Sequence, residues 1–310
     1  MKQCIKALAL GLLAIGLTGC AAFNYTKPDS PVPQPSVDPL MPTPRVALVL
    51  GSGGPRGYAH IGVMRVLEEA GLEIDLVVGS SVGSLIGAFW AYGYTADQLD
   101  QIAQSGGPLT LFDLSLFADR GWIHGQRLQN YVNDKLGNAV IEQFPRRLIV
   151  AATRRTDKQA VFFDRGNVGV AVRASSAVPG IISPVGIQGV EYEDADESLP
   201  VAVRAAREAG AQFVIAIDVS ARPGAAPPGT SAKMLERDAT RRSRIDPETQ
   251  KADFLIHPDM DYAASPLASY FRQAQLAGEL TARQLLPQLM EKILSMQSNA
   301  RIAAGRQVGD

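Results

Sequence analysis

Short apolar segments alternate with amphipathic segments along the chain from residue 46 onward. Apolar runs at 46–50 and 75–79 are bounded by turn-forming residues, as is typical of strands buried on both faces. The segments 58–70 and 82–92 follow them with helical spacing. The pattern continues, with strands expected at 147–153, 160–163, 212–219 and 252–257, and helices at 125–136, 200–210 and 266–296, the last broken at Pro287. This alternation predicts one α/β domain with a mostly parallel sheet.

The first twenty residues differ in character from the rest. Lys2 and Lys6 precede an apolar run from Ala7 to Leu17, which is too short to cross a bilayer as a helix. This arrangement predicts a secretory signal peptide over residues 1–19. The run ends in Leu-Thr-Gly-Cys20, which resembles the lipobox of bacterial lipoproteins and implies lipidation of Cys20. A plain signal peptide with an incidental cysteine is the alternative.

Residues 20–44 are rich in proline and poor in side chains that could pack. Seven prolines fall between residues 28 and 44. Because proline fixes φ and lacks an N–H, we expect an extended tether that reaches on the order of 70 Å. A lipid on Cys20 would hold the protein on a membrane without a spanning helix. Ala21, rather than Asp, follows the cysteine, and by resemblance to lipoprotein sorting in Gram-negative bacteria this implies the outer membrane of the cell envelope.

Composition narrows the range of functions. The chain has 46% apolar and 20% charged residues and a net charge of −1, which excludes a disordered protein. No cluster of Lys and Arg is large enough to follow a phosphate backbone, so nucleic acid is not expected as a partner. The two cysteines are Cys4 and Cys20, which leaves the domain at 45–310 without a disulfide framework or a cysteine-based zinc site. We expect neither a metal nor an organic cofactor.

The first chemical motif is Gly79-Ser80-Ser81-Val82-Gly83, a G-x-S-x-G between a predicted strand and a predicted helix. The turn is so tight that no Cβ fits two residues before or after the central serine. Its strained backbone lifts the serine hydroxyl over the end of the sheet, beside a helix N-terminus. We therefore expect Ser81 to be a nucleophile and Ser80 to face the packing side.

The second motif is the loop Gly51-Ser-Gly-Gly-Pro-Arg-Gly57, also between a strand and a helix. Backbone N–H groups in such a loop converge on an anion. A P-loop is excluded, because Tyr58 stands where Lys-Ser/Thr should follow. A dinucleotide site would need an acidic residue at the end of the second strand, where the serine turn lies. An oxyanion hole for acyl transfer uses both loops together and is favoured.

Two further segments complete a resemblance to the patatin-like phospholipase family. Ala59-His-Ile-Gly-Val63 follows the glycine loop, and Arg173-Ala-Ser-Ser-Ala-Val-Pro-Gly180 is similar to a family segment that precedes the acid. The resemblance covers most of residues 45–220. It implies a three-layer α/β sandwich and a serine acyl hydrolase with a Ser–Asp dyad that acts on phospholipid or other acyl esters. It also implies roles in the site: Ser81 as nucleophile, the Gly53 and Gly54 amides as oxyanion donors, and Arg56 as the arginine of that loop.

Two aspartates compete for the acid of the dyad. The family carries Asp-Gly at this place, whereas this chain has Asp194-Ala195, and alanine disfavours the positive φ that glycine permits. Asp194 is expected because it follows a short strand, and Asp196 is the alternative. Ser52 also departs from the family, which often has glycine there. A calcium loop that starts at Asp194 is excluded, because its sixth and twelfth positions lack the required glycine and glutamate.

A Ser–His–Asp triad is the alternative within hydrolases. Its histidine would come late in the chain, which points to His257, but that fold does not predict the glycine loop after the first strand. We expect His60 to be a packing residue and Asp218 to fix a loop. Residues 220–251 are expected to form a solvated loop with a short surface helix, or alternatively a mobile flap or basic membrane-facing segment, and 252–310 to supply the last strand and the C-terminal helices.

These observations predict a phospholipase A, lysophospholipase or esterase, anchored by lipid in the bacterial envelope. The substrate would be a phospholipid or another acyl ester. The alternative is a catalytically inactive envelope lipoprotein of the same fold, acting as a lipid-binding or interaction module. Only the Asp194-Ala195 departure favours that alternative.

Overall fold

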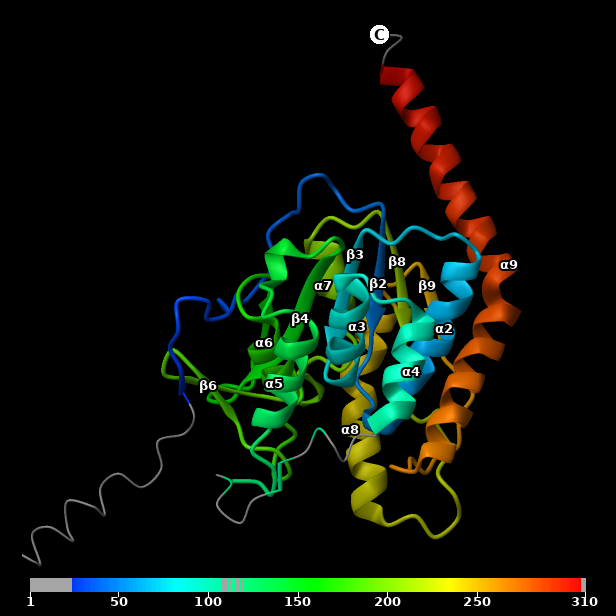
Figure 1. Cartoon of the computed structure of the whole chain (residues 1–310). Helices are drawn as coiled ribbons and strands as arrows, with labels where there is room; N and C mark the ends of the chain where they lie inside the picture. The colour runs from blue at the N-terminus through cyan, green and yellow to red at the C-terminus, as the bar shows by residue number, and fades with distance from the viewer. Residues whose placement is uncertain (1–23, 107–110, 112, 115–117, 119, 308–310) are drawn as a thin grey trace, which may run out of the picture.

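The computed structural model describes residues 24–106, 111, 113–114, 118 and 120–307 (Figure 1). The predicted signal peptide and Cys20 lie outside these residues. Within the described ranges, no helix combines the length and the apolarity that a bilayer crossing requires.

A nine-stranded sheet forms the centre of the described part of the chain (Figure 1). Its order is β1-β6-β7-β4-β3-β2-β8-β9, and β5 pairs with β4 off this path. The strands are β1 (Asn24–Tyr25), β2 (Val46–Leu50), β3 (Leu76–Ser80), β4 (Arg147–Arg154), β5 (Ala160–Phe163), β6 (Val185–Ile187), β7 (Val190–Glu193), β8 (Phe213–Ile217) and β9 (Phe254–Ile256). The run β4-β3-β2-β8-β9 is parallel throughout, whereas the pairs β4–β5, β4–β7 and β6–β7 are antiparallel.

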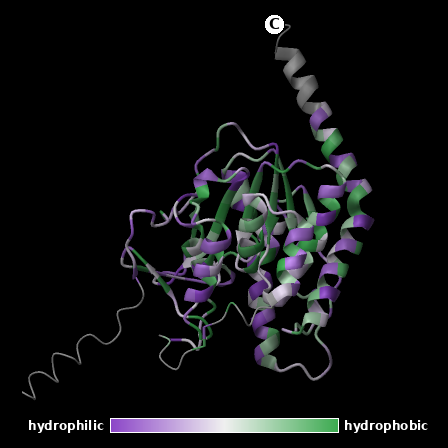
Figure 2. Ribbon diagram, in the orientation of Figure 1, coloured by the Kyte–Doolittle hydropathy of each residue, from purple (hydrophilic) through white to green (hydrophobic). Residues whose placement is uncertain are grey.

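Helices cover both faces of this sheet. They are α2 (Tyr58–Glu69), α3 (Val82–Tyr92), α4 (Ala96–Gly106), α5 (Gln126–Lys135), α6 (Val168–Ser175), α7 (Val203–Glu208), α8 (Ala232–Thr249) and α9 (Ala268–Gln307), with 3-10 helices η1 (Gly54–Gly57), η3 (Ile141–Gln143) and η4 (Ala195–Glu197). Alternate residues of β2 face opposite sides, as strand geometry requires. Leu48 belongs to the apolar core that includes residues of α2, α3, α5, α6 and α9, and Val49 belongs to the core on the other face, which includes residues of α7 and α8. Figure 2 shows the apolar strands between these layers. The predicted three-layer α/β fold is confirmed.

The predicted elements around the two glycine motifs match the structure closely. Strands at 46–50 and 160–163 and the helix at 82–92 have the expected bounds. The structure adds α4 and α6, which the sequence pattern did not predict.

The prediction of an extended spacer is wrong for residues 24–44, which we call the N-terminal strap. β1 pairs with β6, and Gln34 exchanges two backbone hydrogen bonds with Phe162 (2.9 and 2.8 Å). Val37 is buried, and its amide donates to the Glu208 carboxylate (2.9 Å). Prolines remove their own donors, but the residues between them still pair with the domain. The strap therefore lies against the domain instead of holding it at a distance.

The long helix α9 continues through Pro287, where the sequence predicted a break. Pro287 is exposed, so the carbonyl that loses its helical partner can be hydrated by solvent. Buried Ala282, Leu289 and Ile293 hold the helix on the domain on both sides of this position. The helix α9 therefore packs against the domain on both sides of Pro287.

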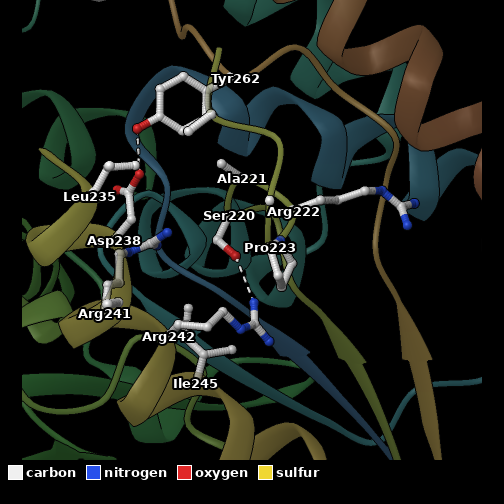
Figure 3. Close-up of a pocket in the computed structure, with 13 residues that line it drawn as sticks. Ser220, Ala221, Arg222, Pro223, Leu235, Asp238, Arg241, Arg242, Ile245 and Tyr262 are labelled. Atoms are coloured by element: carbon white, nitrogen blue, oxygen red, sulfur yellow. Dashed lines mark hydrogen bonds between the residues drawn. The ribbon is translucent and has the colours of Figure 1, made fainter. Parts of the chain in front are cut away.

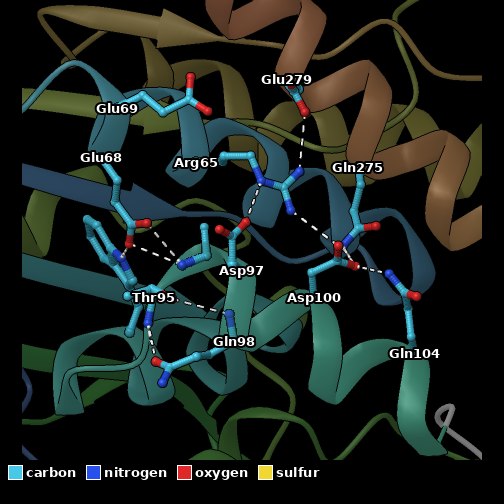
Figure 4. A network of polar contacts seen from close by, with 12 residues as sticks. Arg65, Glu68, Glu69, Thr95, Asp97, Gln98, Asp100, Gln104, Gln275 and Glu279 are labelled. Atoms are coloured by element: carbon cyan, nitrogen blue, oxygen red, sulfur yellow. Dashed lines mark hydrogen bonds and ion pairs between the residues drawn. The ribbon is translucent and has the colours of Figure 1, made fainter.

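A polar network orients α4 against α2 and α9 (Figure 4). Arg65 of α2 pairs with Asp97 and Asp100 of α4 (3.0 and 3.2 Å) and with Glu279 of α9 (3.2 Å). The Gln275 amide donates to Asp100 (2.8 Å). Partly exposed ion pairs of this kind contribute little stability each, so their main effect is to select one orientation of the three helices.

Helices α2 and α9 cross at two glycines, and this crossing predicts a stability effect. A Cβ at Gly62 would lie 2.7 Å from the Glu279 amide nitrogen, and one at Gly278 would lie 2.8 Å from the Ala59 carbonyl carbon. We expect Gly278→Ala to lower the free energy of unfolding by about 2 kcal/mol, because overpacking outweighs the gain in helix propensity. Urea denaturation measures the change. Gln284→Ala, on the exposed side of α9, is the control, and equal stability of the two variants would contradict the close crossing.

Candidate active site

Ser81 occupies a strained turn between β3 and α3. Its backbone has φ 54° and ψ −124°, a conformation that a residue with a side chain rarely adopts. A Cβ at Gly79 would lie 2.5 Å from the Ser84 Cα, and one at Gly83 would lie 2.9 Å from the Gly51 carbonyl oxygen, so both positions require glycine. The neighbouring Ser80 is buried, and its hydroxyl donates to the Leu199 carbonyl (2.9 Å). The turn thus has the form that the motif predicted.

The structure brings Asp194, and not Asp196, to Ser81. The Ser81 hydroxyl donates to Asp194 Oδ2 at 2.7 Å, and the Asp194 side chain is fully enclosed by protein. Its other oxygen accepts the Asp196 amide (2.8 Å), and its carbonyl accepts the Thr153 hydroxyl (2.8 Å). These contacts hold the carboxylate in one orientation, facing the serine.

The environment of Asp194 changes its acidity. Burial in the first place, and the nearby charge of Asp196, raise the pKa of Asp194 to about 7, although hydrogen bonds from the Asp196 amide and Ser81 lower it. A carboxylate with a pKa near neutrality is suited to accept a proton and then return it.

The alanine at 195 fits this geometry without strain. Ala195 is the first residue of η4, where φ is negative, and Asp194 is the N-cap of that helix. A glycine is therefore not required after Asp194. The one feature that favoured an inactive protein has a structural explanation.

Two serines support the turn, and the sequence did not assign them a role. The Ser175 hydroxyl accepts the Ser81 amide (2.8 Å), and the Ser84 hydroxyl donates to the Ser81 carbonyl (2.6 Å). Ser175 belongs to the segment 173–180, whose resemblance to the family was the available signal.

The glycine loop packs directly against the serine turn. A Cβ at Gly57 would lie 2.5 Å from a methyl group of Val82, and Gly83 lies against the end of β2. The Gly53 and Gly54 amides have no acceptor among the described residues. They remain able to donate to a bound oxyanion.

Arg56 was expected to belong to the oxyanion loop of the site, but its side chain points to a different part of the chain. Its guanidinium donates to the carbonyl of Tyr262, in the segment before α9. Burial lowers the pKa of Arg56. The observed contact anchors the glycine loop to that segment, which sequence reasoning did not foresee.

Helix α8 connects the glycine loop to the aspartate loop through Arg241. Its guanidinium donates to the Ser52 carbonyl and hydroxyl (2.8 and 2.9 Å) and pairs with Asp196 (2.7 Å). Ser52 itself donates to Asp196. We call this arrangement the Arg241 clamp. The alternative acid is therefore engaged in an ion pair.

The prediction for residues 220–251 is corrected by the same helix. A solvated loop is present at 221–230, as expected, but the helix that follows is not short, because α8 extends over 18 residues. Ile245 is completely buried in the core between α7 and the sheet. Of the interleaved charges that suggested solvation, Glu236 and Arg237 are exposed, whereas Arg241, Arg242 and Arg244 bond to the loops at 52, 218–220 and 196.

A cavity of about 270 Å³ lies beside the Arg241 clamp (Figure 3). Arg242 and Tyr262 line it with Arg241. Asp218 lies behind it, accepting Arg242 (2.7 Å) and the Ser220 amide (2.9 Å). Burial alone would raise the pKa of Asp218, but His257, Ser220 and Arg242 outweigh it and leave that pKa below its usual value. Asp218 fixes this loop, as expected from the sequence.

His257 and His60 bond to groups other than Ser81. His257 contacts the Ser220 carbonyl (2.9 Å) and lies 3.8 Å from Asp218. His60 is buried, contacts the Gly51 carbonyl (2.8 Å), and has its pKa lowered by burial to about 4. It is a neutral support of the glycine loop. Among the described residues, no three His, Cys, Asp or Glu side chains gather into a metal-binding group.

Comparison with known proteins fits this geometry. Residues 48–196 match the model of the patatin-like phospholipase family. This segment of the chain belongs to that family. The matched segment contains Ser81, Asp194 and the glycine loop, and it ends at Asp196 of the Arg241 clamp.

The relatives extend beyond this chain. An uncharacterized NTE family protein of Mycobacterium tuberculosis is 37% identical over 205 residues, which is 63% of this chain and 56% of that protein. Lysophospholipase NTE1 of Coccidioides immitis is 32% identical over 191 residues, 59% of this chain and 12% of that protein. The chain thus spans little more than half of the first relative and a small part of the second. The crystal structure of VipD from Legionella pneumophila shares the fold, with a TM-score of 0.53 at 14% identity over 85% of this chain and 71% of that one.

Proposed function

We propose that this chain is a serine acyl hydrolase that cleaves acyl esters of lipids. The observation that carries the proposal is the 2.7 Å hydrogen bond from the Ser81 hydroxyl to a buried Asp194 whose pKa is about 7. The patatin-like phospholipase domain and a relative named as a lysophospholipase support a lipid ester as the substrate.

In the proposed reaction, Asp194 accepts the Ser81 proton as Ser81 Oγ attacks the ester carbonyl. The Gly53 and Gly54 amides donate to the oxyanion that forms. The alcohol leaves with the proton held by Asp194, and the acyl group stays on Ser81. Water then attacks the acyl-enzyme, Asp194 accepts its proton and returns it to Ser81, and the fatty acid is released.

The substrate and the location follow from the same proposal. We infer activity as a phospholipase A, lysophospholipase or esterase, because the site needs only an accessible acyl ester. A lipid on Cys20 would hold the protein at the outer membrane of the bacterial envelope, next to such esters.

A fluorophosphonate probe tests the site directly. The probe reacts with a serine that has an intact base and oxyanion hole, so Ser81 should be labelled and identified by peptide mass spectrometry. Incubation with a total bacterial lipid extract should release fatty acid. Absence of both labelling and fatty-acid release would refute the proposal.

The pKa of Asp194 predicts the pH dependence of hydrolysis. The ionised carboxylate is the form that accepts a proton, so kcat/KM should fall about tenfold per pH unit below pH about 7 and level off above it. Asp196→Asn removes a negative charge that raises the pKa of Asp194 and should move this acid limb to lower pH. A pH–rate profile of both proteins measures the shift. An unmoved limb would contradict the assignment of Asp194 as the base.

The Arg241 clamp predicts a positioning effect. Arg241→Met should lower kcat by about 10- to 100-fold, because the glycine loop and the aspartate loop lose their shared partner. Arg241→Lys keeps a positive charge beside Asp196. Its kcat should therefore lie between those of Arg241→Met and the wild type, and its pH profile should be closer to that of the wild type than the profile of Arg241→Met. Lys233→Met, on the exposed side of α8, is the matched control. Equal rates for Arg241→Met and Lys233→Met would show that the Arg241 clamp has no positioning role in catalysis.

A further inference from the structure

Two neighbouring loops expose large apolar side chains close to one another. Trp122 is 65% exposed and Ile181 is 50% exposed. The two loops are joined, because the Trp122 and Ile123 amides both donate to the Ile181 carbonyl (2.9 and 3.0 Å). The exposed side chains on these loops and on the segment bridged to Ile123, which we call the Trp122 face, are Leu114, Trp122, Val178 and Ile181.

The Trp122 face adjoins the serine and aspartate of the site. Val178 directly follows Ala177, whose carbonyl accepts the Asp194 amide (3.0 Å). Ser175, two residues before Ala177, accepts the Ser81 amide (2.8 Å). A single segment therefore contacts both dyad residues and then turns outward into the apolar face.

The N-terminal strap brings the beginning of the described chain to the same side. Asn24 pairs with Gly186 of β6, five residues after Ile181, and Figure 1 shows the first described residues beside β6. Four residue steps separate Cys20 from Asn24, and a fully extended chain covers about 14 Å over that length. Because the strap is paired with the domain, residues 24–44 add no further reach. A lipid on Cys20 would thus enter a membrane close to the Trp122 face.

We propose that the Trp122 face inserts into the phospholipid surface that holds the Cys20 anchor. Tryptophan with aliphatic neighbours is the composition that settles at a membrane interface, where the ring is buried and its N–H stays hydrated. An apolar cluster of this kind on a soluble domain marks a contact surface. The role of the face in bringing lipid esters to Ser81 rests on the proposed function, whereas its insertion does not.

Tryptophan fluorescence gives a direct test, because the two tryptophans of the chain have opposite environments. Trp90 is buried and Trp122 is exposed. The chain from residue 20 onward, with Cys20→Ser and Ser81→Ala, carries neither the predicted signal peptide nor a lipid, and it hydrolyses no lipid. With vesicles of phosphatidylcholine and phosphatidylglycerol, its emission should shift to shorter wavelength and iodide quenching should fall. Further introduction of Trp122→Phe should abolish the change.

Vesicle flotation of matched variants completes the test. In the same background, Trp122→Ser with Ile181→Ser should weaken partitioning about tenfold, which corresponds to about 1.4 kcal/mol. Leu276→Ser with Leu280→Ser, an equally exposed apolar pair on α9, is the control and should leave partitioning unchanged. An unshifted Trp122 emission in bound protein, or equal losses in both pairs, would overturn the proposal.

Two further outcomes are distinguishable. A spectral shift without vesicles that grows with protein concentration, together with a doubled mass by light scattering, would assign the face to a second copy of the chain and overturn insertion. Vesicle insertion in a chain whose Ser81 never labels or turns over ester would leave the Trp122 face in place and refute only the hydrolase function.

Discussion

Ser81→Ala will lower kcat/KM for p-nitrophenyl ester hydrolysis by about 10³-fold or more, and labelling by a fluorophosphonate probe will disappear. The reason is geometric. The Ser81 hydroxyl is 2.7 Å from the Asp194 carboxylate, at the point where the serine turn and the glycine loop meet. Alanine keeps the backbone of the turn and removes the oxygen of the proposed nucleophile.

Ser80→Ala is the matched control for this experiment. Ser80 is adjacent in sequence, but its hydroxyl is buried and bonded to the Leu199 carbonyl. Its loss should cost about 1 kcal/mol of stability and leave turnover within a few-fold of the wild type. Full activity in Ser81→Ala would refute the nucleophile, whatever Ser80→Ala does.

Asp194→Asn will also lower kcat/KM by about 10³-fold, because an amide of nearly the same shape cannot accept the serine proton. Asp196→Asn should cost only about tenfold at pH 8, since Asp196 acts through Arg241 and Ser52 and does not contact Ser81. Steady-state rates at pH 8 compare the two variants. The reverse order would identify Asp196 as the acid.

Stability separates lost catalysis from misfolding in Asp194→Asn. The folded-state pKa of Asp194 is raised from 3.8 to about 7, so keeping this group ionised destabilises the fold as the pH rises through that interval. The neutral amide has no such cost. At pH 8 the Tm of Asp194→Asn should therefore equal or exceed that of the wild type, and a marked fall in Tm would attribute the lost activity to unfolding.

Sequence reasoning succeeded where the signal was local. The buried strand at 46–50, the helix at 82–92 and the two glycine motifs are each determined by neighbouring residues, and the structure has them as expected. The requirement for glycine at 79 and 83 is also local, because the turn itself brings their Cβ positions into contact with the backbone.

Polar contacts between residues far apart in the sequence could not be predicted in this way. Arg241 and Ser52 are 189 positions apart, and nothing in either neighbourhood indicates that they meet. Asp194 and Asp196 are two positions apart and have similar neighbours in the sequence. Only the placement of η4 decides which of them faces Ser81. Side-chain choice of this kind depends on tertiary packing.

Proline content led to wrong predictions at two segments of the chain. Proline content predicted a free tether at residues 20–44, but Gln34 and Val37 supply backbone partners that a count of prolines does not show. Pro287 predicted a broken helix, yet its exposed position allows α9 to continue. In both cases the neighbours of the proline decided the outcome.

The N-terminal strap also covers backbone groups of two strands of the sheet. Asn24 and Tyr25 cover the open side of β6, and Gln34 covers the open side of β5 at Phe162. A protein produced from residue 45 onward would expose these backbone groups as templates for strand addition between molecules. A truncated protein of this kind should therefore aggregate more readily, and expression of the patatin-like domain should retain the chain from residue 24.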